Sequence, residues 1–196
     1  LAGHPMVAKK RLGREIVRAL SPQFAIVACY GRNHDGAQLL QRETGCEIFP
    51  ADVSRESDVE RLFQTSFWAI VHAAGIARDA LLLRQSLESW HQTLRVNADG
   101  AFLVARAALR NLPRGGRLIL LSSRVGERGA AGQAAYAASK AAMLALCKTA
   151  AREGAESGIC VNAICPPFVP SALSENLSGE AMQALQSQSV FGCEGS

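Results

Sequence analysis

The chain has 196 residues, of which 48% are hydrophobic and 19% are charged, a composition typical of one globular domain with a substantial core. Its formal net charge of +4 is modest, and the basic residues are spread along the chain, which argues against a nucleic-acid-binding surface. No apolar run approaches the roughly 20 residues that cross a bilayer, and the first residues lack the apolar stretch of a secretory signal. We therefore predict a cytoplasmic protein with no membrane or nucleic-acid partner.

Short apolar runs alternate with segments of helical composition along the chain. Strands are expected over residues 24–30, 47–50, 68–74, 117–122 and 159–165, with one more near residues 6–8. Helices are expected over residues 11–20, 35–44, 54–64, 86–110 and 133–156. Strands that are apolar throughout and alternate with helices predict a doubly wound parallel sheet with helices on both faces. We expect a single α/β domain over residues 1–196, with ligands beyond the carboxyl ends of its strands.

Two joints between these elements are unusually short. Helix 54–64 is followed by strand 68–74 after only Thr65, Ser66 and Phe67, with no glycine, proline or asparagine to form a turn. The strand near residues 6–8 meets helix 11–20 with almost no loop, and the sequence does not begin with methionine. We therefore expect the sequence to be an incomplete record of a longer chain.

The cysteines and histidines are scattered and do not suggest a metal centre. The six cysteines include no C-x-x-C pair, and the four histidines are dispersed as well. Because metal sites need grouped ligands, we expect no metal. Most of the cysteines lie within apolar runs, so we expect buried, reduced thiols. They are Cys29, Cys46, Cys147, Cys160, Cys165 and Cys193.

The pair Tyr136 and Lys140 is the strongest indication of chemistry. Residues four apart lie on one face of a helix, one turn from each other. A phenol has a pKa of roughly 10, and a neighbouring ammonium group favours the phenolate, which moves that pKa toward neutrality. Tyr136 is therefore a candidate proton donor for ketone reduction, or the base of the reverse reaction. Taken alone the spacing is a weak motif, because a tyrosine and a lysine at this separation also decorate ordinary helices.

Other polar residues give this pair a context. Strand 117–122 delivers Ser122 and Ser123 at its carboxyl end, and Tyr136 follows Ser123 by thirteen residues. Asn97 lies within the long helix 86–110, where an asparagine can break regular helical bonding and hold an ordered water.

With these residues the chain resembles the short-chain dehydrogenase/reductase family. The stretch Gly132-Gln133-Ala-Ala-Tyr136-Ala-Ala-Ser139-Lys140 is most similar to the 3-oxoacyl-[acyl-carrier-protein] reductases. Weaker similarity extends over nearly the whole chain, for example at Leu12-Gly13-Arg14-Glu15-Ile16 and at Val161-Asn162-Ala163-Ile164. The resemblance implies a Rossmann-type fold and an oxidoreductase that uses a nicotinamide cofactor.

The resemblance also implies a role for each residue of the motif. Tyr136 would be the acid/base, and Ser123 would hydrogen-bond the substrate carbonyl oxygen. Lys140 would lower the tyrosine pKa and bind the nicotinamide ribose, and Asn97 would support a water that connects Lys140 to solvent. Ser122 is the alternative for the serine role, but the thirteen-residue spacing to Tyr136 favours Ser123.

The cofactor contacts implied by the family follow the ends of the strands. Asp52 matches the position that binds adenine, with the Val53 amide beside it; the alternative is a helix-capping aspartate, although Ser54 is better placed for that. NAD-preferring sites usually have an acidic residue just past the second strand, whereas Arg32 here suits the 2′-phosphate of NADP(H). We therefore expect NADP(H) ahead of NAD(H), with solvated surface charge as the alternative reading of Arg32. The other expected contacts are Arg11, Leu12, Gly13, Ala73, Ala74, Gly75, Tyr136, Lys140, Pro166 and Val169, with Lys10 or Arg11 assisting Arg32.

The chain departs from the family pattern in three places. Only Gly13 cleanly matches the glycine-rich T-G-x-x-x-G-x-G turn that brings backbone close to a pyrophosphate. The usual Asn-Asn-Ala-Gly after the fourth strand reads His72-Ala73-Ala74-Gly75, where His72 is more readily a satisfied core histidine than a catalytic one. The usual Pro-Gly after the sixth strand reads Pro166-Pro167, which stiffens the loop that borders the nicotinamide.

Three functions are compatible with these features. The first is NADPH-dependent reduction of a 3-oxoacyl thioester of acyl carrier protein or CoA, the second is the same chemistry on another ketone or secondary alcohol, and the third is a non-catalytic scaffold. The loop after Pro167 and residues 178–190 would form the substrate lid, and Arg114 lies where related reductases can present a basic residue to an acidic carrier. Ser157, where many of them have another arginine, weakens that carrier reading. The family also implies a homo-oligomer, a tetramer or a dimer.

Overall fold

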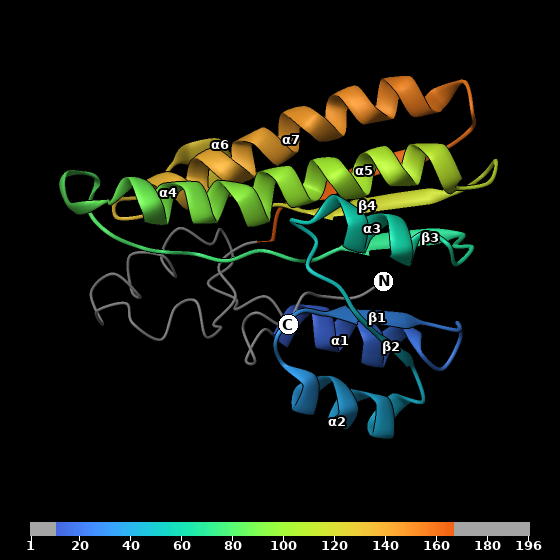
Figure 1. Cartoon of the computed structure of the whole chain (residues 1–196). Coiled ribbons are helices and arrows are strands. Elements are labelled where there is room, and N and C mark those ends of the chain that lie inside the picture. The colour runs from blue at the N-terminus through green and yellow to red at the C-terminus, as the bar shows by residue number, and fades with distance from the viewer. Residues whose placement is uncertain (1–10, 167–196) are drawn as a thin grey trace, which may run out of the picture.

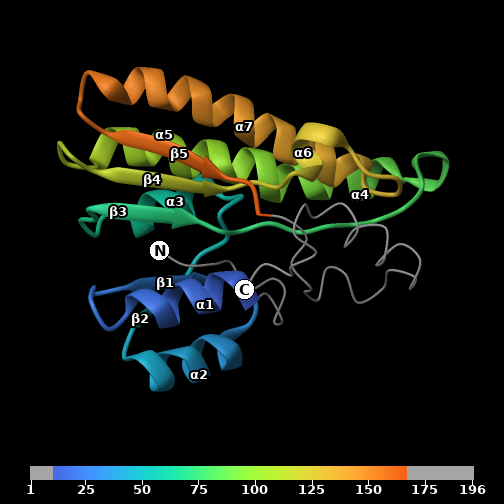
Figure 2. The same cartoon turned by 180° about the vertical axis from the view of Figure 1, so that it is seen from behind.

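The computed structural model describes residues 11–166, in which parallel strands alternate with helices (Figures 1 and 2). The strands of this part of the chain are β1 Val27–Tyr30, β2 Glu47–Pro50, β3 Ala69–His72, β4 Arg117–Leu121 and β5 Cys160–Ile164. β1 pairs with β2, while β3, β4 and β5 form a second sheet in that order, and every pair is parallel. The strand expected near residues 6–8 lies outside the described residues.

The helices lie close to the ranges that composition predicts. They are α1 Arg11–Leu20, α2 His34–Thr44, α3 Glu56–Leu62, α4 Leu87–Leu94, α5 Gly100–Asn111, α6 Val125–Arg128 and α7 Ala134–Ala155, with a 3₁₀-helix at Leu82–Arg84. α5 lies in front of β4 in Figure 1 and behind it in Figure 2, so it covers one face of the β3–β4–β5 sheet. Within residues 11–166 no helix is long and apolar enough to cross a bilayer. The parallel α/β fold class is confirmed.

Two helix boundaries differ from expectation for local reasons. The predicted helix 86–110 is interrupted by a π-helical segment, Arg95–Asp99, so that α4 and α5 are separate helices joined by a wider turn. α3 begins only at Glu56, and its N-cap is Arg55, whose side chain makes no capping hydrogen bond. Ser54 is therefore not the cap: its hydroxyl donates to Asp52 Oδ1 at 2.7 Å and its N–H donates to the same oxygen at 3.0 Å.

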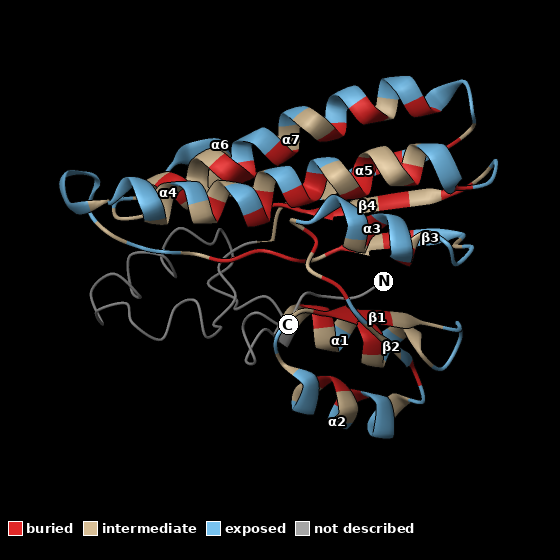
Figure 3. Cartoon of the chain, viewed as in Figure 1, coloured by how far each residue is buried: buried red, intermediate tan, exposed pale blue. Residues whose placement is uncertain are grey.

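The main core lies between the β3–β4–β5 sheet and helices α5 and α7. Ile70, Leu118 and Leu120 from the strands and Met143 from α7 are all fully buried. Burying a side chain of this size contributes roughly 1.5–3 kcal/mol, so these strands are held mainly by the side chains that α5 and α7 cover. Figure 3 shows the buried positions concentrated on the strands and along stripes of these helices. A smaller cluster, Val17, Ala28, Leu40 and Cys46, joins α1 and α2 to β1.

The described cysteines follow the expectation in part. Cys29, Cys46 and Cys147 are buried, and burial raises the pKa of the Cys29 thiol to about 12, which makes it a poor nucleophile. Cys160, in contrast, is exposed and Cys165 is half-buried, because each lies at or just beyond an end of β5. Cys193 lies outside the described residues.

Candidate active site

The first two turns of α7 bring the tyrosine and the lysine to the carboxyl end of β4. Tyr136 is the third residue of α7, and Lys140 follows one turn later, with its Nζ donating to the carbonyl oxygen of Leu121 at 2.6 Å. Gly132, with φ of +78°, makes the turn that starts the helix, a backbone conformation that other residues rarely adopt. The helix entry and the strand end thus meet at these two side chains.

Ser123 and Ser122 play different parts in this arrangement. Ser123 shares a hydrogen bond with the Tyr136 hydroxyl, and its Oγ also accepts from the Val125 N–H at 3.2 Å. Ser122 is buried, and its hydroxyl donates to the Lys140 carbonyl oxygen at 3.0 Å. The structure therefore brings Ser123 to the tyrosine, whereas Ser122 anchors α7 to the end of β4.

The acidity of Tyr136 differs from the sequence-based expectation. Burial raises the pKa of Tyr136 to about 12; the hydrogen bond from Ser123 lowers it, and the charge of Asp79 raises it. The expected net shift of this pKa toward neutrality is not found, because burial dominates; Lys140 Nζ donates to the Leu121 carbonyl oxygen and lies 5.7 Å from the centre of the tyrosine ring. A phenol with this pKa keeps its proton at neutral pH, which suits a proton donor.

Lys140 is a buried cation with few polar partners. Its exposed fraction is 4%, and burial lowers the pKa of its ammonium group to about 8, while the nearby Cys165 raises it. In the described part of the chain, the hydrogen-bond partners of its ammonium group are the Leu121 carbonyl oxygen and, at 4.0 Å, Met143 Sδ. Lys140 is therefore largely protonated at pH 7 and places positive charge beside the Tyr136 ring.

Asn97 interrupts the regular helix, as predicted, and lies on the buried side of the site. It lies in the π-helical segment Arg95–Asp99 and is fully buried. Its Oδ1 accepts from the Ile76 N–H at 2.7 Å, and its Nδ2 donates to the Ile76 carbonyl oxygen at 2.8 Å and to Ser139 Oγ at 2.9 Å. The side chain thereby joins the segment after β3 to α7, next to Lys140. The expected link through water stays a prediction.

Gly75 brings the segment after β3 against Asn97 and Lys140. A Cβ built on Gly75 would lie 3.1 Å from Asn97 Oδ1 and 3.6 Å from Lys140 Nζ. A side chain at this position would crowd both residues, so glycine allows the backbone after β3 to approach them. Of the neighbouring residues, His72 and Ala74 are buried and Ala73 is half-buried.

The residues expected at the adenine end follow β1 and β2. Asp52 Oδ1 accepts both hydrogen bonds from Ser54, and the Asp52 N–H donates to Asp58 Oδ2 at 2.8 Å. Val53 is buried and packs against the backbone at Gly100. Arg32 is exposed just beyond β1, next to Asn33, whose side chain caps α2 by accepting from the Gly36 N–H.

The remaining expected contacts are only partly described. Leu12 and Gly13 lie in the first turn of α1, Gly13 buried and Leu12 half-buried, and Pro166 is half-buried at the end of the described range. Arg11 begins α1, but its side chain is outside the description. Lys10, Pro167, Val169 and the expected lid, residues 178–190, also lie outside the described residues.

Three residues near the site were given no role in it by the sequence. Gln133 Nε2 donates to Asp79 Oδ2 at 2.9 Å, which joins the segment after β3 to the start of α7. Cys165, just beyond β5, is near Lys140 and Ser122, and burial raises the pKa of its thiol. Gln133 stands in the motif quoted above, but no spacing rule indicates that it pairs with Asp79.

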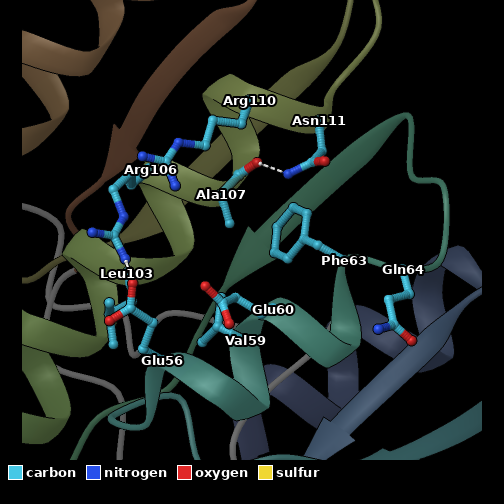
Figure 4. A pocket seen from close by; sticks show the side chains of 10 residues that line it. All are labelled: Glu56, Val59, Glu60, Phe63, Gln64, Leu103, Arg106, Ala107, Arg110 and Asn111. Atoms are coloured by element: carbon cyan, nitrogen blue, oxygen red, sulfur yellow. Dashed lines mark hydrogen bonds and ion pairs between the residues drawn. The ribbon is translucent and has the colours of Figure 1, made fainter.

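A groove elsewhere on the molecule is separate from this cluster. It has a volume of about 280 Å³ and lies between α3 and α5, where Glu56 and Arg106 form an ion pair (Figure 4). It is lined by Glu56, Val59, Glu60, Phe63, Gln64, Leu103, Arg106, Ala107, Arg110 and Asn111. None of the four predicted catalytic residues contributes to it.

Comparison with known proteins identifies the family of the chain. A family model described as "Enoyl-(Acyl carrier protein) reductase" matches residues 7–196. The chain belongs to the short-chain dehydrogenase/reductase family. This confirms the resemblance found in the sequence and makes the protein an oxidoreductase of this family.

Individual members of the short-chain dehydrogenase/reductase family are similar over most of the chain. A 3-oxoacyl-[acyl-carrier-protein] reductase of Synechocystis is 37% identical over 187 residues, 88% of this chain and 76% of that protein. Nodulation protein G of Rhizobium is 34% identical over 184 residues, 89% of this chain and 75% of that protein. Carbonyl reductase family member 4 of Danio rerio is 34% identical over 180 residues, 87% of this chain and 76% of that protein.

The fold is also that of solved members of the family. A short chain dehydrogenase from Burkholderia cenocepacia, crystallised in complex with NADP, superposes with a TM-score of 0.88 at 24% identity, over 99% of this chain and 83% of that one. A dehydrogenase/reductase from Sinorhizobium meliloti gives a TM-score of 0.89 at 24% identity, over 99% of this chain and 81% of that one. At this identity the likeness concerns the fold.

Proposed function

We propose that this chain reduces a 3-oxoacyl thioester, carried by acyl carrier protein or CoA, to the 3-hydroxyacyl form with NADPH. The observation that carries the proposal is the hydrogen bond between Ser123 and Tyr136, one helical turn from the buried Lys140. The substrate class is supported by the 37% identity to a protein named 3-oxoacyl-[acyl-carrier-protein] reductase.

Reduction of the ketone adds a hydride to its carbon and a proton to its oxygen. NADPH, when bound, supplies the hydride. The hydroxyls of Ser123 and Tyr136 hydrogen-bond the carbonyl oxygen, where negative charge develops. Tyr136 gives its proton to that oxygen, so the C=O π bond is replaced by a C–H and an O–H bond. The pKa of about 12 keeps this proton on the phenol until the oxygen becomes the stronger base.

Lys140 has two tasks in this scheme. Its positive charge stabilises the phenolate that remains after proton transfer, because an ammonium near a phenol favours the charged form. It would also bind the nicotinamide ribose, and Asn97 would support the water that connects it to solvent. Because burial lowers the pKa of Lys140 to about 8, the lysine gains and loses its proton near the working pH of a cytoplasmic enzyme.

The residues around Gly75 fit a nicotinamide dinucleotide. Gly75 lets the backbone after β3 approach Asn97 and Lys140, because a Cβ at this position would crowd both residues, and Lys140 supplies a cation beside that backbone. We assign Ala73, Ala74, Gly75, Tyr136, Lys140, Pro166 and Val169 to the nicotinamide end and Arg11, Leu12, Gly13, Asp52 and Val53 to the rest of the cofactor. Arg32, exposed at the end of β1, would bind the 2′-phosphate and so favour NADP(H) over NAD(H).

A second candidate is reduction of a simpler ketone by the same residues. It is favoured by relatives at 34% identity whose names specify no acyl thioester, nodulation protein G and carbonyl reductase family member 4. In that case the chemistry at Tyr136 is unchanged, and only the groups that hold the rest of the substrate differ.

We also propose a cytoplasmic homo-oligomer, a tetramer or a dimer. Small side chains allow close packing of helices, and α7 exposes Ala141, Ala142 and Ala145, while Phe102 on α5 is 46% exposed. These surfaces suit contact with a second copy of the chain. Arg114, which is exposed, remains the candidate contact for an acidic carrier.

Replacing Tyr136 tests the proposal directly. Tyr136→Phe is expected to abolish NADPH oxidation with acetoacetyl thioesters, because only the proton-donating hydroxyl is lost, while the Kd for NADPH measured by calorimetry stays nearly unchanged. Tyr30→Phe removes the other tyrosine hydroxyl of the chain and serves as the matched control. Wild-type turnover by Tyr136→Phe would refute the role. Wild-type turnover of simple ketones but not of thioesters would select the second candidate, and neither turnover nor nucleotide binding would select a scaffold.

A further inference from the structure

Three contacts join the segment after β3 to the entry of α7. Gln133 Nε2 donates to Asp79 Oδ2 at 2.9 Å. Beside it, the Ala80 N–H donates to the Gly132 carbonyl oxygen at 2.8 Å, and Ala80 pairs with Gln133 as an isolated parallel bridge. Tyr136 follows Gln133 by three residues. The two segments are therefore held together within one helical turn of the proton donor.

Gln133 uses its side chain across this joint rather than on its own helix. It is the N-cap residue of α7 but makes no side-chain capping hydrogen bond. An N-cap side chain ordinarily accepts from one of the free N–H groups of the first turn. Here the amide is directed to Asp79 instead, so the first turn of α7 is held by the segment after β3 and not by a cap.

We propose that Asp79 and Gln133 are positioning residues for Tyr136: their hydrogen bond ties the first turn of α7 to the segment after β3 and holds the Asp79 carboxylate on the side of the phenol. This inference rests on the proposed role of Tyr136 as proton donor.

The groups that face Tyr136 support the electrostatic part. Ser123, after β4, shares its hydrogen bond, and Lys140, on α7, lies 5.7 Å from the ring centre at Nζ. Asp79, after β3, raises the pKa of Tyr136 because a carboxylate disfavours a second negative charge nearby. Cys165 beyond β5 acts on Lys140, and Glu127 on α6 acts on the thiol of Cys165.

Two variants separate the charge from the link. Asp79→Asn removes the negative charge but keeps an oxygen that accepts from Gln133. Gln133→Ala removes the link but keeps the charge. Asp35→Asn, which neutralises an exposed carboxylate in the first turn of α2, is the matched control for net charge.

Titration of the tyrosines by NMR reports the effect without any need for turnover. The chain has two tyrosines, so tyrosine labelled with ¹³C at Cζ gives two signals, which Tyr136→Phe assigns. In the full-length chain, Asp79→Asn is expected to lower the pKa of Tyr136 by about 0.5, whereas Asp35→Asn is expected to leave this pKa unchanged. Gln133→Ala is expected to lower kcat about tenfold through a misplaced phenol, with KM for the substrate little changed.

The outcomes distinguish this inference from the proposed function. An unchanged Tyr136 pKa in Asp79→Asn would overturn the electrostatic part, and wild-type kcat in Gln133→Ala would overturn the positioning part. If Gln133→Ala does not fold, Gln133→Glu places a second carboxylate against Asp79 and is expected to raise the pKa of Tyr136; a fall would overturn the inference. A chain that reduces nothing but shows the Asp79→Asn change would refute the proposed function and leave the effect of Asp79 on Tyr136 standing.

Discussion

Replacing Asn97 gives a sharp test of how the site is built. Asn97 is fully buried, and its amide makes three hydrogen bonds, two with the backbone of Ile76 and one with Ser139 Oγ. Asn97→Ala removes the partner of both the N–H and the carbonyl of Ile76, a residue that is itself buried. Each buried group left without a partner costs roughly 1–3 kcal/mol, and the small cavity adds to this. We expect Asn97→Ala to lower the free energy of unfolding by about 3–5 kcal/mol.

Urea unfolding followed by circular dichroism measures this loss. Ser139→Ala is the matched comparison, because Ser139 is equally buried but shares only one hydrogen bond with Asn97; its hydroxyl donates to the Tyr136 carbonyl oxygen at 2.7 Å. Its expected cost is about 1 kcal/mol. If Asn97→Ala costs no more than Ser139→Ala, the two Ile76 groups do not depend on the asparagine, and the reasoning is refuted.

Three further predictions address the lysine, a helix contact and the cofactor. The pKa of Lys140 is about 8 in the folded chain against an ordinary 10.5, so the unfolded chain binds more protons between these values and wild-type stability should rise from pH 8 toward pH 9. Above pH 9 the raised pKa of the Cys29 thiol, and above pH 10 that of Tyr136, oppose the rise. Lys140→Met should remove that rise and stabilise the folded chain at pH 7 by on the order of 2 kcal/mol; thermal unfolding across pH decides, and an unchanged profile contradicts it. Gly126→Ala should destabilise by about 2 kcal/mol in urea, because its Cβ would lie 2.7 Å from the Lys140 carbonyl carbon. Gly100→Ala, whose closest neighbour is the Val53 side chain at 3.0 Å, should cost less, and equal costs would remove the steric argument. Arg32→Ala should weaken NADPH binding about tenfold and leave NADH unaffected in calorimetry; equal losses would remove the case for a phosphate contact.

The order of elements could be predicted because each depends on local pattern. Strands such as Arg117–Leu121, in which every residue is buried or half-buried, contain continuous apolar runs, and α7 has the small and long side chains that favour helices. The spacing of Ser123, Tyr136 and Lys140 likewise follows from one strand end and one helix. These features can be predicted without knowing which elements pack around them.

The titration behaviour of the site could not be predicted in the same way. The four-residue separation of Tyr136 and Lys140 gives their proximity, but the depth of burial that raises one pKa to about 12 and lowers the other to about 8 depends on the whole fold. The Asp79–Gln133 hydrogen bond joins residues 54 positions apart. Ser54 was expected to cap α3, but the chain places its hydroxyl on Asp52 because the helix begins two residues later.

The π-helical segment fixes the number of residues between α4 and α5. Each residue advances an α-helix by about 100°, so one extra residue in the winding rotates everything before it relative to everything after it by roughly that angle. Removing one residue from Arg95–Asp99 would restore regular winding, swing Asn97 away from Ile76 and turn α4 off its contact with α7. The insertion or deletion of a single residue in this stretch would therefore move Asn97 and α4 out of place and disrupt the site.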